Sequence, residues 1–343
     1  MRRALTIIGA AVALSLLGGA CGGGDVAGRA DGGGSETINI VGFAVPEAAN
    51  KAIADEFGAT PEGEGVRFRT SYGASGDQSR AVESGLEADY VHFSVASDVT
   101  RLVDAGLVAD TWDDGPTKGI VSRSIVVFAV REGNPKGIDS WDDLVRPGIE
   151  IVTPNPSSSG AARWNALAAW GQVIADGGTE EEASEYLDRF FANVVSLPGS
   201  GRDATTAFLG GTGDVFMTYE NEAILARQHG EEFDYVIPET TMLIENPGAI
   251  LLDATPVAQA WLDFVLGEEG QRQLALKGFR PVIDGLEVDE VEGALDPSDP
   301  FPEVANLLTV DEDFGSWSEL SKTFFDETTG IVTKAIEKSG KAS

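Results

Sequence analysis

Short β-rich runs alternate with longer amphipathic runs along most of this chain, and this order constrains the fold more than any other feature. Over the first hundred residues the pattern predicts strands at 37–43, 66–72 and 90–96 and helices at 46–57 and 75–86. The alternation continues beyond them, and a strongly amphipathic run at 258–278 predicts one further helix. This order predicts an α/β protein with a largely parallel sheet.

The first twenty residues have the pattern of a secretory signal peptide. A positively charged start is followed by an apolar run and by three small residues before Cys21. The segment LLGGAC resembles a bacterial lipoprotein signal, which implies that Cys21 becomes the lipidated N-terminus; the alternative is an unmodified cysteine after an ordinary signal. Residues 21–36 are rich in glycine and predict a flexible tether. We therefore expect a folded body that is anchored outside the cell membrane.

The charge of the chain excludes one class of partner and constrains another. Asp and Glu total 56 against 24 Lys and Arg, which gives a formal net charge of −32. Nucleic acid is excluded as a partner, because no broad basic surface is available to neutralise phosphates. Long-range attraction of a small anion is also disfavoured, so any anion site must work through local dipoles in a shielded cleft.

Residues that could carry catalysis or bind a metal are scarce. Of the two histidines, His92 lies in a strand-like run and is expected in the core, whereas His229 is expected at a solvated helix end. Neither has a metal-ligand spacing, and no nucleotide-binding or nucleophile motif appears, so we expect no metal, no cofactor and no enzyme activity. A hydrolase that uses a serine stays an unsupported alternative.

Three junctions between a strand and a helix share a Ser-Gly pair, at residues 75–76, 159–160 and 200–201. Ligands of α/β proteins bind at the carboxyl ends of strands, where such junctions lie. Each serine can simply cap its helix by accepting from a first-turn N–H. Alternatively, the unsatisfied N–H groups of the three helices can hold an oxyanion together. The occurrence of three matching junctions favours an anion site.

Several segments, taken in order, resemble the periplasmic sulfate- and thiosulfate-binding proteins of ABC importers. They are SYGASGDQSRAVESGLEADYV, VREGNPKGIDSWDDLVRPGIEIVTPNPSSSGAARWNALAAWG, GRDATTAF, GDVFMTYENEA and EEGQRQLALKGFRPV. The resemblance covers about residues 38 to 325. It implies a two-lobe periplasmic-binding-protein fold of type II, with a mostly parallel or mixed sheet flanked by helices in each lobe and the ligand cleft between them. Residues 37–120 and 238–343 would form lobe 1, and residues 121–237 lobe 2.

The resemblance also implies the ligand contacts, all of them neutral hydrogen-bond donors. The residues that it assigns to the ligand are Ala44, Ser75, Gly76, Ser159, Gly160, Ala161, Gly201, Arg202 and Tyr219. The chain departs from the family pattern at Tyr219, which replaces a tryptophan, and at Ala44, which replaces an aspartate. Acidic residues also stand at Asp77 and Asp203. If either carboxylate faced the cleft it would repel sulfate, whereas in a first helical turn it is expected to face water.

The function that the resemblance implies is the capture of sulfate, or thiosulfate, outside the cytoplasm and its delivery to an ABC permease. We expect a monomer that is held to the membrane by its lipid. Two alternatives remain open: the ligand is another oxyanion, such as phosphate or molybdate, or the protein is an anchored oxyanion sensor. Sulfate carries no proton near neutral pH, so a site with donors only suits it, whereas a protonated phosphate would leave its O–H without an acceptor.

Overall fold

The computed structural model describes residues 36–288 and 290–341, and these belong to one compact unit. The predicted signal peptide, Cys21 and nearly all of the tether lie outside the described residues. The strands are β1 (Thr37–Phe43), β2 (Arg67–Gly73), β3 (Tyr90–His92), β4 (Ile120–Arg131), β5 (Ile151–Val152), β6 (Val194–Ser196), β7 (Val215–Tyr219), β8 (Phe233–Val236), β9 (Thr240–Ile250) and β10 (Asn306–Leu308).

Helices follow most of these strands. They are α1 (Glu47–Phe57), α2 (Ser75–Glu83), α3 (Ala96–Asp104), α4 (Trp141–Leu144), α5 (Gly160–Ala175), α6 (Glu180–Asn193), α7 (Gly201–Leu209), α8 (Glu220–Gln228), α9 (Val257–Leu266), α10 (Glu268–Leu276), α11 (Val310–Asp313), α12 (Trp317–Thr323) and α13 (Ile331–Lys338). The alternation of strands and helices predicted from the sequence is therefore confirmed.

The strands form a mixed sheet in the order β2-β1-β3-β9-β4-β7-β5-β6, with β10 paired to β9 and β8 to β4. Strand β1 pairs in parallel with β2 and β3, and β5 pairs in parallel with β6 and β7. Strands β4 and β9 run antiparallel to each other and to β7 and β3, respectively. The sheet is thus less uniformly parallel than the alternation of elements predicts.

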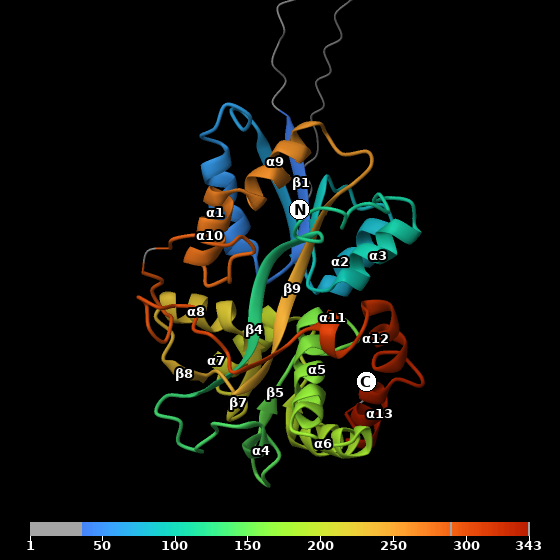
Figure 1. Ribbon diagram of the computed structural model, residues 1–343, viewed down its shortest axis with the longest axis vertical. Coiled ribbons are helices and arrows are strands. Elements are labelled where there is room, and N and C mark those ends of the chain that lie inside the picture. The colour runs from blue at the N-terminus through green and yellow to red at the C-terminus, as the bar shows by residue number, and fades with distance from the viewer. Residues whose placement is uncertain (1–35, 289, 342–343) are drawn as a thin grey trace, which may run out of the picture. The chain divides into compact units, whose positions relative to one another are not determined.

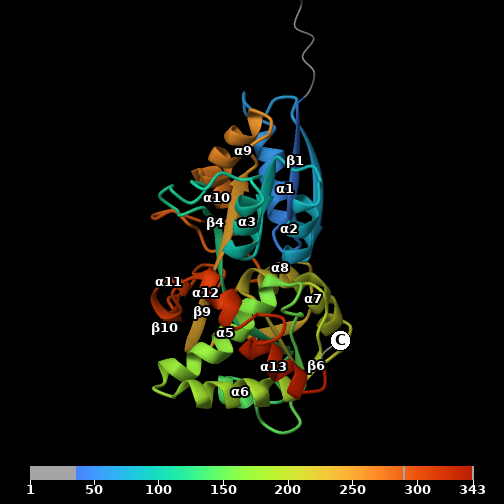
Figure 2. The same ribbon diagram turned by 90° about the vertical axis from the view of Figure 1, so that its right-hand side faces the viewer.

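Two long strands connect the two ends of the described body. Figures 1 and 2 show β4 and β9 passing from the region of α1, α2, α3, α9 and α10 to the region of α5, α6, α7 and α8. Their antiparallel pairing places Ile125 opposite Leu243 and Ser122 opposite Asn246. Ten of the twelve side chains of β4 are buried, as expected for a strand that is covered on both faces.

One predicted helix is two helices in the structure. The amphipathic run 258–278 predicts a single helix, but α9 ends and α10 begins at Gly267, whose backbone is extended (φ −74°, ψ 169°). The break lets α10 turn back, and Gly270 packs so closely on Phe264 and Val265 that a Cβ would lie 2.2 Å from the Phe264 carbonyl oxygen. Hydrophobic periodicity spans the break because both helices bury residues in the same core.

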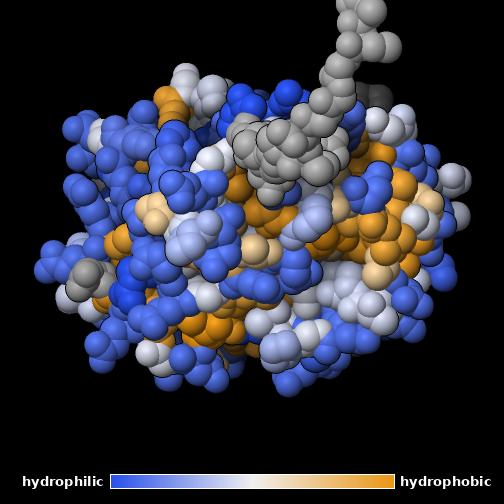
Figure 3. Space-filling view, turned by 90° about the horizontal axis from the view of Figure 1, so that it is seen from above, coloured by the Kyte–Doolittle hydropathy of each residue, from blue (hydrophilic) through white to orange (hydrophobic). Residues whose placement is uncertain are grey.

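The visible surface is mostly hydrophilic. Hydrophilic residues cover much of the face seen in Figure 3, with smaller hydrophobic areas between them. Among the described residues, no helix is both long and apolar enough to cross a membrane.

His92 occupies the core position that the sequence predicts, and His229 lies exposed after α8, also as predicted. The His92 ring is fully buried on β3, with Nε2 3.0 Å from Ser122 Oγ and Nδ1 3.3 Å from the Asn50 side chain. Burial lowers the pKa of His92 from 6.5 to about 3, because the imidazolium would lose its hydration. The ring is therefore neutral throughout the physiological range.

Acidification is expected to destabilise the protein through His92. Its folded pKa lies below its unfolded value, so its contribution is present above pH 6.5 and is lost as the pH falls towards about 3. By pH 5 the loss amounts to about 2 kcal/mol. Urea unfolding at pH 7 and pH 5 measures it, and His92→Gln should reduce the difference between the two pH values by that amount. The matched variant at the exposed histidine, His229→Gln, should keep the wild-type difference; equal behaviour of the two variants would contradict the assignment.

Candidate functional site

The three Ser-Gly junctions that the sequence singles out meet at one small cavity. Its walls are formed by the end of β1, the turn before α2, the loop after β3 and the first residues of α5 and α7. The lining residues are Phe43, Ala44, Val45, Gly73, Ala74, Ser75, Ser94, Ser159, Gly160, Ala161, Ser200 and Gly201. Six of the nine predicted ligand residues are among them, and the exceptions are Gly76, Arg202 and Tyr219.

The three serines differ in what they do at the helix starts. Ser200 caps α7, since its Oγ accepts from the Asp203 N–H at 3.1 Å. Ser159 occupies the N-cap of α5 but its side chain makes no capping bond, and within the described residues its Oγ has no hydrogen-bond partner although the residue is buried. Capping therefore explains Ser200 but not Ser159, whose hydroxyl remains available to the cavity.

Ser75 is the first residue of α2, and its hydroxyl is already engaged. Its Oγ donates to Asp98 Oδ2 at 2.6 Å and accepts from the Ser94 N–H at 2.9 Å. Burial raises the pKa of the Asp98 carboxyl, while the nearby Arg163 guanidinium acts in the opposite direction. Only the backbone N–H of Ser75 is left to serve a ligand.

Backbone donors without partners converge on the cavity. Among the described residues, none accepts a hydrogen bond from the N–H groups of Val45, Ser75, Gly160, Ala161 or Gly201. First-turn N–H groups of helices lack intrahelical acceptors, and the helix dipole adds a partial positive charge there. The helix starts are close together, since a Cβ on Gly201 would lie 3.5 Å from Ala161 Cβ and 3.4 Å from Val45 Cγ2. Their arrangement suits a small anion.

Within residues 36–288 and 290–341, no charged side chain lines the cavity. Arg202 instead forms a two-bond ion pair with Glu222, with Nη2 2.8 Å from Oε1 and Nε 3.1 Å from Oε2. Neither Asp77 nor Asp203 is among the residues that line the cavity: Asp77 is exposed and pairs with Arg80, and the exposed Asp203 accepts from Ser200 Oγ at 2.8 Å. Their expected orientation towards water is therefore confirmed.

Tyr219 does not line the cavity itself, but its hydroxyl contacts the hydroxyl of a residue that does. It ends β7, is almost fully buried, and its phenol oxygen is 2.6 Å from Ser94 Oγ. Burial raises the pKa of Tyr219, so the phenol stays protonated. Ser94, not Tyr219, lines the cavity.

The residues that form the cavity wall pack closely against one another. A Cβ on Gly160 would lie 2.3 Å from Ser94 Oγ, so only glycine fits at the start of α5. The Gly76 N–H donates to the Ser158 carbonyl at 3.1 Å, which joins α2 to the loop before α5. The remaining cavity volume is about 10 Å³, the space of about one water molecule. A tetrahedral oxyanion is larger than one water molecule, so the walls would have to move apart to hold it.

Sequence reasoning missed two residues of this site. The Ala44 N–H donates to the Gly73 carbonyl at 2.9 Å and extends the β1–β2 pairing, whereas the N–H of the next residue, Val45, has no partner in the part of the chain that the structure describes. Nothing in a valine side chain signals that role. Ser94 follows β3 at a strand-to-helix junction, so the junction rule could have found it, but no glycine follows it.

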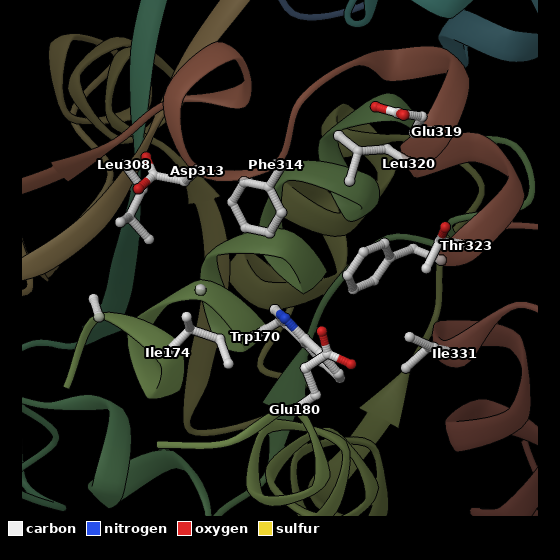
Figure 4. A pocket seen from close by; sticks show the side chains of 13 residues that line it. Trp170, Ile174, Glu180, Leu308, Asp313, Phe314, Glu319, Leu320, Thr323 and Ile331 are labelled. Atoms are coloured by element: carbon white, nitrogen blue, oxygen red, sulfur yellow. The ribbon is translucent and has the colours of Figure 1, made fainter. Parts of the chain in front are cut away.

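A wider hollow elsewhere has a different character. It has a volume of about 480 Å³ and lies between α5, α6 and the C-terminal helices. Figure 4 shows the apolar side chains of Trp170, Phe314 and Leu320 around it, with the carboxylates of Glu180 and Glu319 beside them. Three acidic residues, Glu180, Asp313 and Glu319, are among its lining, so it does not suit an anion. Among the described residues, no cluster of three or more side chains that could hold a metal ion occurs.

Comparison with known proteins gives consistent results. The model of the bacterial extracellular solute-binding protein family matches residues 38–280. The chain is 40% identical to a sulfate-binding protein of Synechococcus elongatus, covering 90% of this chain and 89% of that protein. It is 36% identical to a thiosulfate-binding protein of Pseudomonas aeruginosa, covering 77% and 80% of the two chains, respectively.

A solved structure agrees. The sulfate-binding protein SubI from Mycobacterium tuberculosis is 43% identical and superimposes with a TM-score of 0.79, covering 85% of this chain and all of that one. The resemblance and the fold class inferred from the sequence are thereby confirmed. The chain belongs to the bacterial extracellular solute-binding proteins.

Proposed function

We propose that this protein captures sulfate outside the cytoplasm and delivers it to an ABC permease, and that it is a binding protein rather than an enzyme. One observation carries the proposal: the N-termini of α2, α5 and α7 and the Ser159 hydroxyl meet at a cavity with no charged lining. The names of the related sulfate-binding proteins support the same ligand. Thiosulfate is the second anion that such a site would accept.

The donors explain how a dianion is held without a cation. Each N–H contributes a short-range dipole, and these dipoles act strongly in a buried site from which water is excluded. A protonated oxyanion such as phosphate would place its O–H against donors and leave it without an acceptor. The site should therefore prefer a fully ionised anion.

We further propose that two lobes close over the ligand. Residues 37–120 and 238–343 would form one lobe and residues 121–237 the other, joined through β4 and β9. The C-terminal helices contact the second lobe, although this division places them in the first. The Lys338 ammonium lies 2.7 Å from the Asp188 carboxylate, and Phe324 packs edge-on against Trp170. Residues after about 306 are therefore expected to move with α5 and α6.

Removing the free hydroxyl at the start of α5 tests the proposed site. Ser159→Ala is expected to weaken sulfate binding about ten- to a hundred-fold, because a hydrogen bond to a charged group is lost while the fold is kept. Calorimetric titration of the body from Thr37 onward with sulfate, thiosulfate, phosphate and molybdate measures the affinity for each anion and so the order of preference among them.

The control is a serine that caps a helix away from the cavity. Ser316 caps α12 by accepting from the Glu319 N–H at 3.2 Å, so Ser316→Ala should lower stability slightly and leave sulfate affinity unchanged. Tight phosphate or molybdate binding without sulfate binding would contradict the proposed ligand and leave the family assignment intact. Turnover of a bound ester would contradict the proposal of a binding protein.

We also propose that the protein is a monomeric lipoprotein, exported by residues 1–20 and anchored through Cys21. The LLGGAC segment and the Gly-rich run after it support this proposal. Cys21→Ser in the full-length protein is expected to move it from the membrane fraction to the soluble fraction and to remove the mass of the lipid from the mature chain. Ser35→Ala in the tether serves as the control. A wild-type protein without added lipid mass would refute the anchor.

A further inference from the structure

We propose that Ser94 donates a hydrogen bond to the bound anion and that a chain of buried side chains fixes its hydroxyl in that direction. The chain, called the donor chain below, consists of Asn50, His92, Ser122, Asn246 and Tyr219. The inference rests on the proposed function and adds to it a specificity-determining hydroxyl and its positioning residues.

The orientation of Asn246 fixes the middle of the donor chain. One end of its amide lies 3.0 Å from the Ser94 carbonyl oxygen, which can only accept, so that end is the Nδ2 group. The other end is therefore the oxygen, and it accepts from Ser122 Oγ at 3.3 Å. Both residues are fully buried, so no water competes for these bonds.

The direction continues back to His92. Because Ser122 has used its only hydrogen, its Oγ must accept from His92 Nε2, 3.0 Å away, which therefore carries the proton. A neutral ring then has an unprotonated Nδ1, which requires a donor, whereas the Asn50 amide presents its oxygen, Oδ1, 3.3 Å away. Turning that amide so that Nδ2 faces the ring also provides a partner for Asn50 Nδ2, which otherwise has none among the described residues.

The donor chain runs forward from Asn246 to the cavity. Asn246 Nδ2 reaches Ser94 through its bond to the Ser94 carbonyl, and among the described residues the buried Tyr219 hydroxyl has Ser94 Oγ as its hydrogen-bond partner. Tyr219 can then use its own hydrogen on Ser94 Oγ, 2.6 Å away. Ser94 is left with one hydrogen and a position in the cavity wall. The Ser94 hydroxyl therefore directs its hydrogen, and not a lone pair, towards the ligand.

This arrangement affects selectivity as well as affinity. A lone serine hydroxyl can donate or accept by rotating, so it could serve a protonated anion. A Ser94 hydroxyl that already accepts from Tyr219 is held as a donor, and each bond in the donor chain polarises the next. The site then offers no acceptor at this wall, which favours sulfate over protonated phosphate.

A double-mutant cycle on sulfate affinity tests the inference. Ser94→Ala is expected to weaken binding about ten- to a hundred-fold. Tyr219→Phe should weaken it less and should narrow the preference for sulfate over phosphate, because the freed Ser94 hydroxyl can also accept. In the Ser94→Ala background, Tyr219→Phe should have almost no further effect. If the two substitutions instead weaken sulfate binding by independent factors that multiply, Tyr219 donates to the anion directly, and the inference is overturned.

Controls separate a specific effect from a loss of fold. Tyr186 is another buried tyrosine, whose hydroxyl donates to the Trp141 carbonyl at 2.6 Å, and Tyr186→Phe should leave affinity and preference unchanged. Equal weakening of sulfate and phosphate by Tyr219→Phe would mean a merely structural role and would also overturn the inference. Failure of the wild type to bind sulfate overturns the proposed function as well, so the two failures are distinguishable.

One measurement needs no variant in the site. Nitrogen-15 NMR of the wild-type ring, with His229→Gln to assign the two histidines, reports which nitrogen of His92 carries the proton. The donor chain requires protonation at Nε2 and an unprotonated Nδ1. Protonation at Nδ1 would mean that Ser122 donates to His92 and would overturn the part of the inference that includes Asn50, His92 and Ser122, even if the substituted proteins fail to fold.

Discussion

The antiparallel pairing of β4 with β9 is the interaction on which the rest of the structure depends. These strands hold the parallel groups β1-β2-β3 and β5-β6-β7 in one sheet order, since β3 pairs with β9 and β7 pairs with β4. The junctions after β2, β5 and β6 can therefore open towards the same cavity. Without the two long strands, the start of α2 would belong to one sheet and the starts of α5 and α7 to another, with no fixed relation between them.

The same two strands carry the polar core beside the cavity. Ser122 of β4 and Asn246 of β9 face each other in the register, and His92 of β3 completes the contact. Buried polar groups cost stability unless each has a partner, so such a group of side chains tolerates few arrangements. The pairing thus specifies the backbone and the orientation of the polar atoms together.

The sequence predicts the positions of the helix starts well because strand-to-helix junctions leave a local signature. Ser75, Ser159 and Gly201 were all predicted from that signature and all line the cavity. Val45 could not be predicted, because its contribution is a backbone N–H that any residue would provide. The pairing of Ser94 with Tyr219 joins residues 125 positions apart, so only the folded structure reveals it. The break at Gly267 was missed because α9 and α10 share one buried core.

The uncharged lining of the cavity has a consequence for the conditions under which the protein works. At physiological salt, interactions between exposed charges more than about 8–10 Å apart are largely screened, whereas buried dipoles at contact distance are screened much less. An anion held by N–H and O–H groups alone would keep its affinity as salt rises. The acidic surface, which repels anions as they approach, is screened under the same conditions. Added salt would therefore raise the rate of anion capture without lowering the affinity for the bound anion.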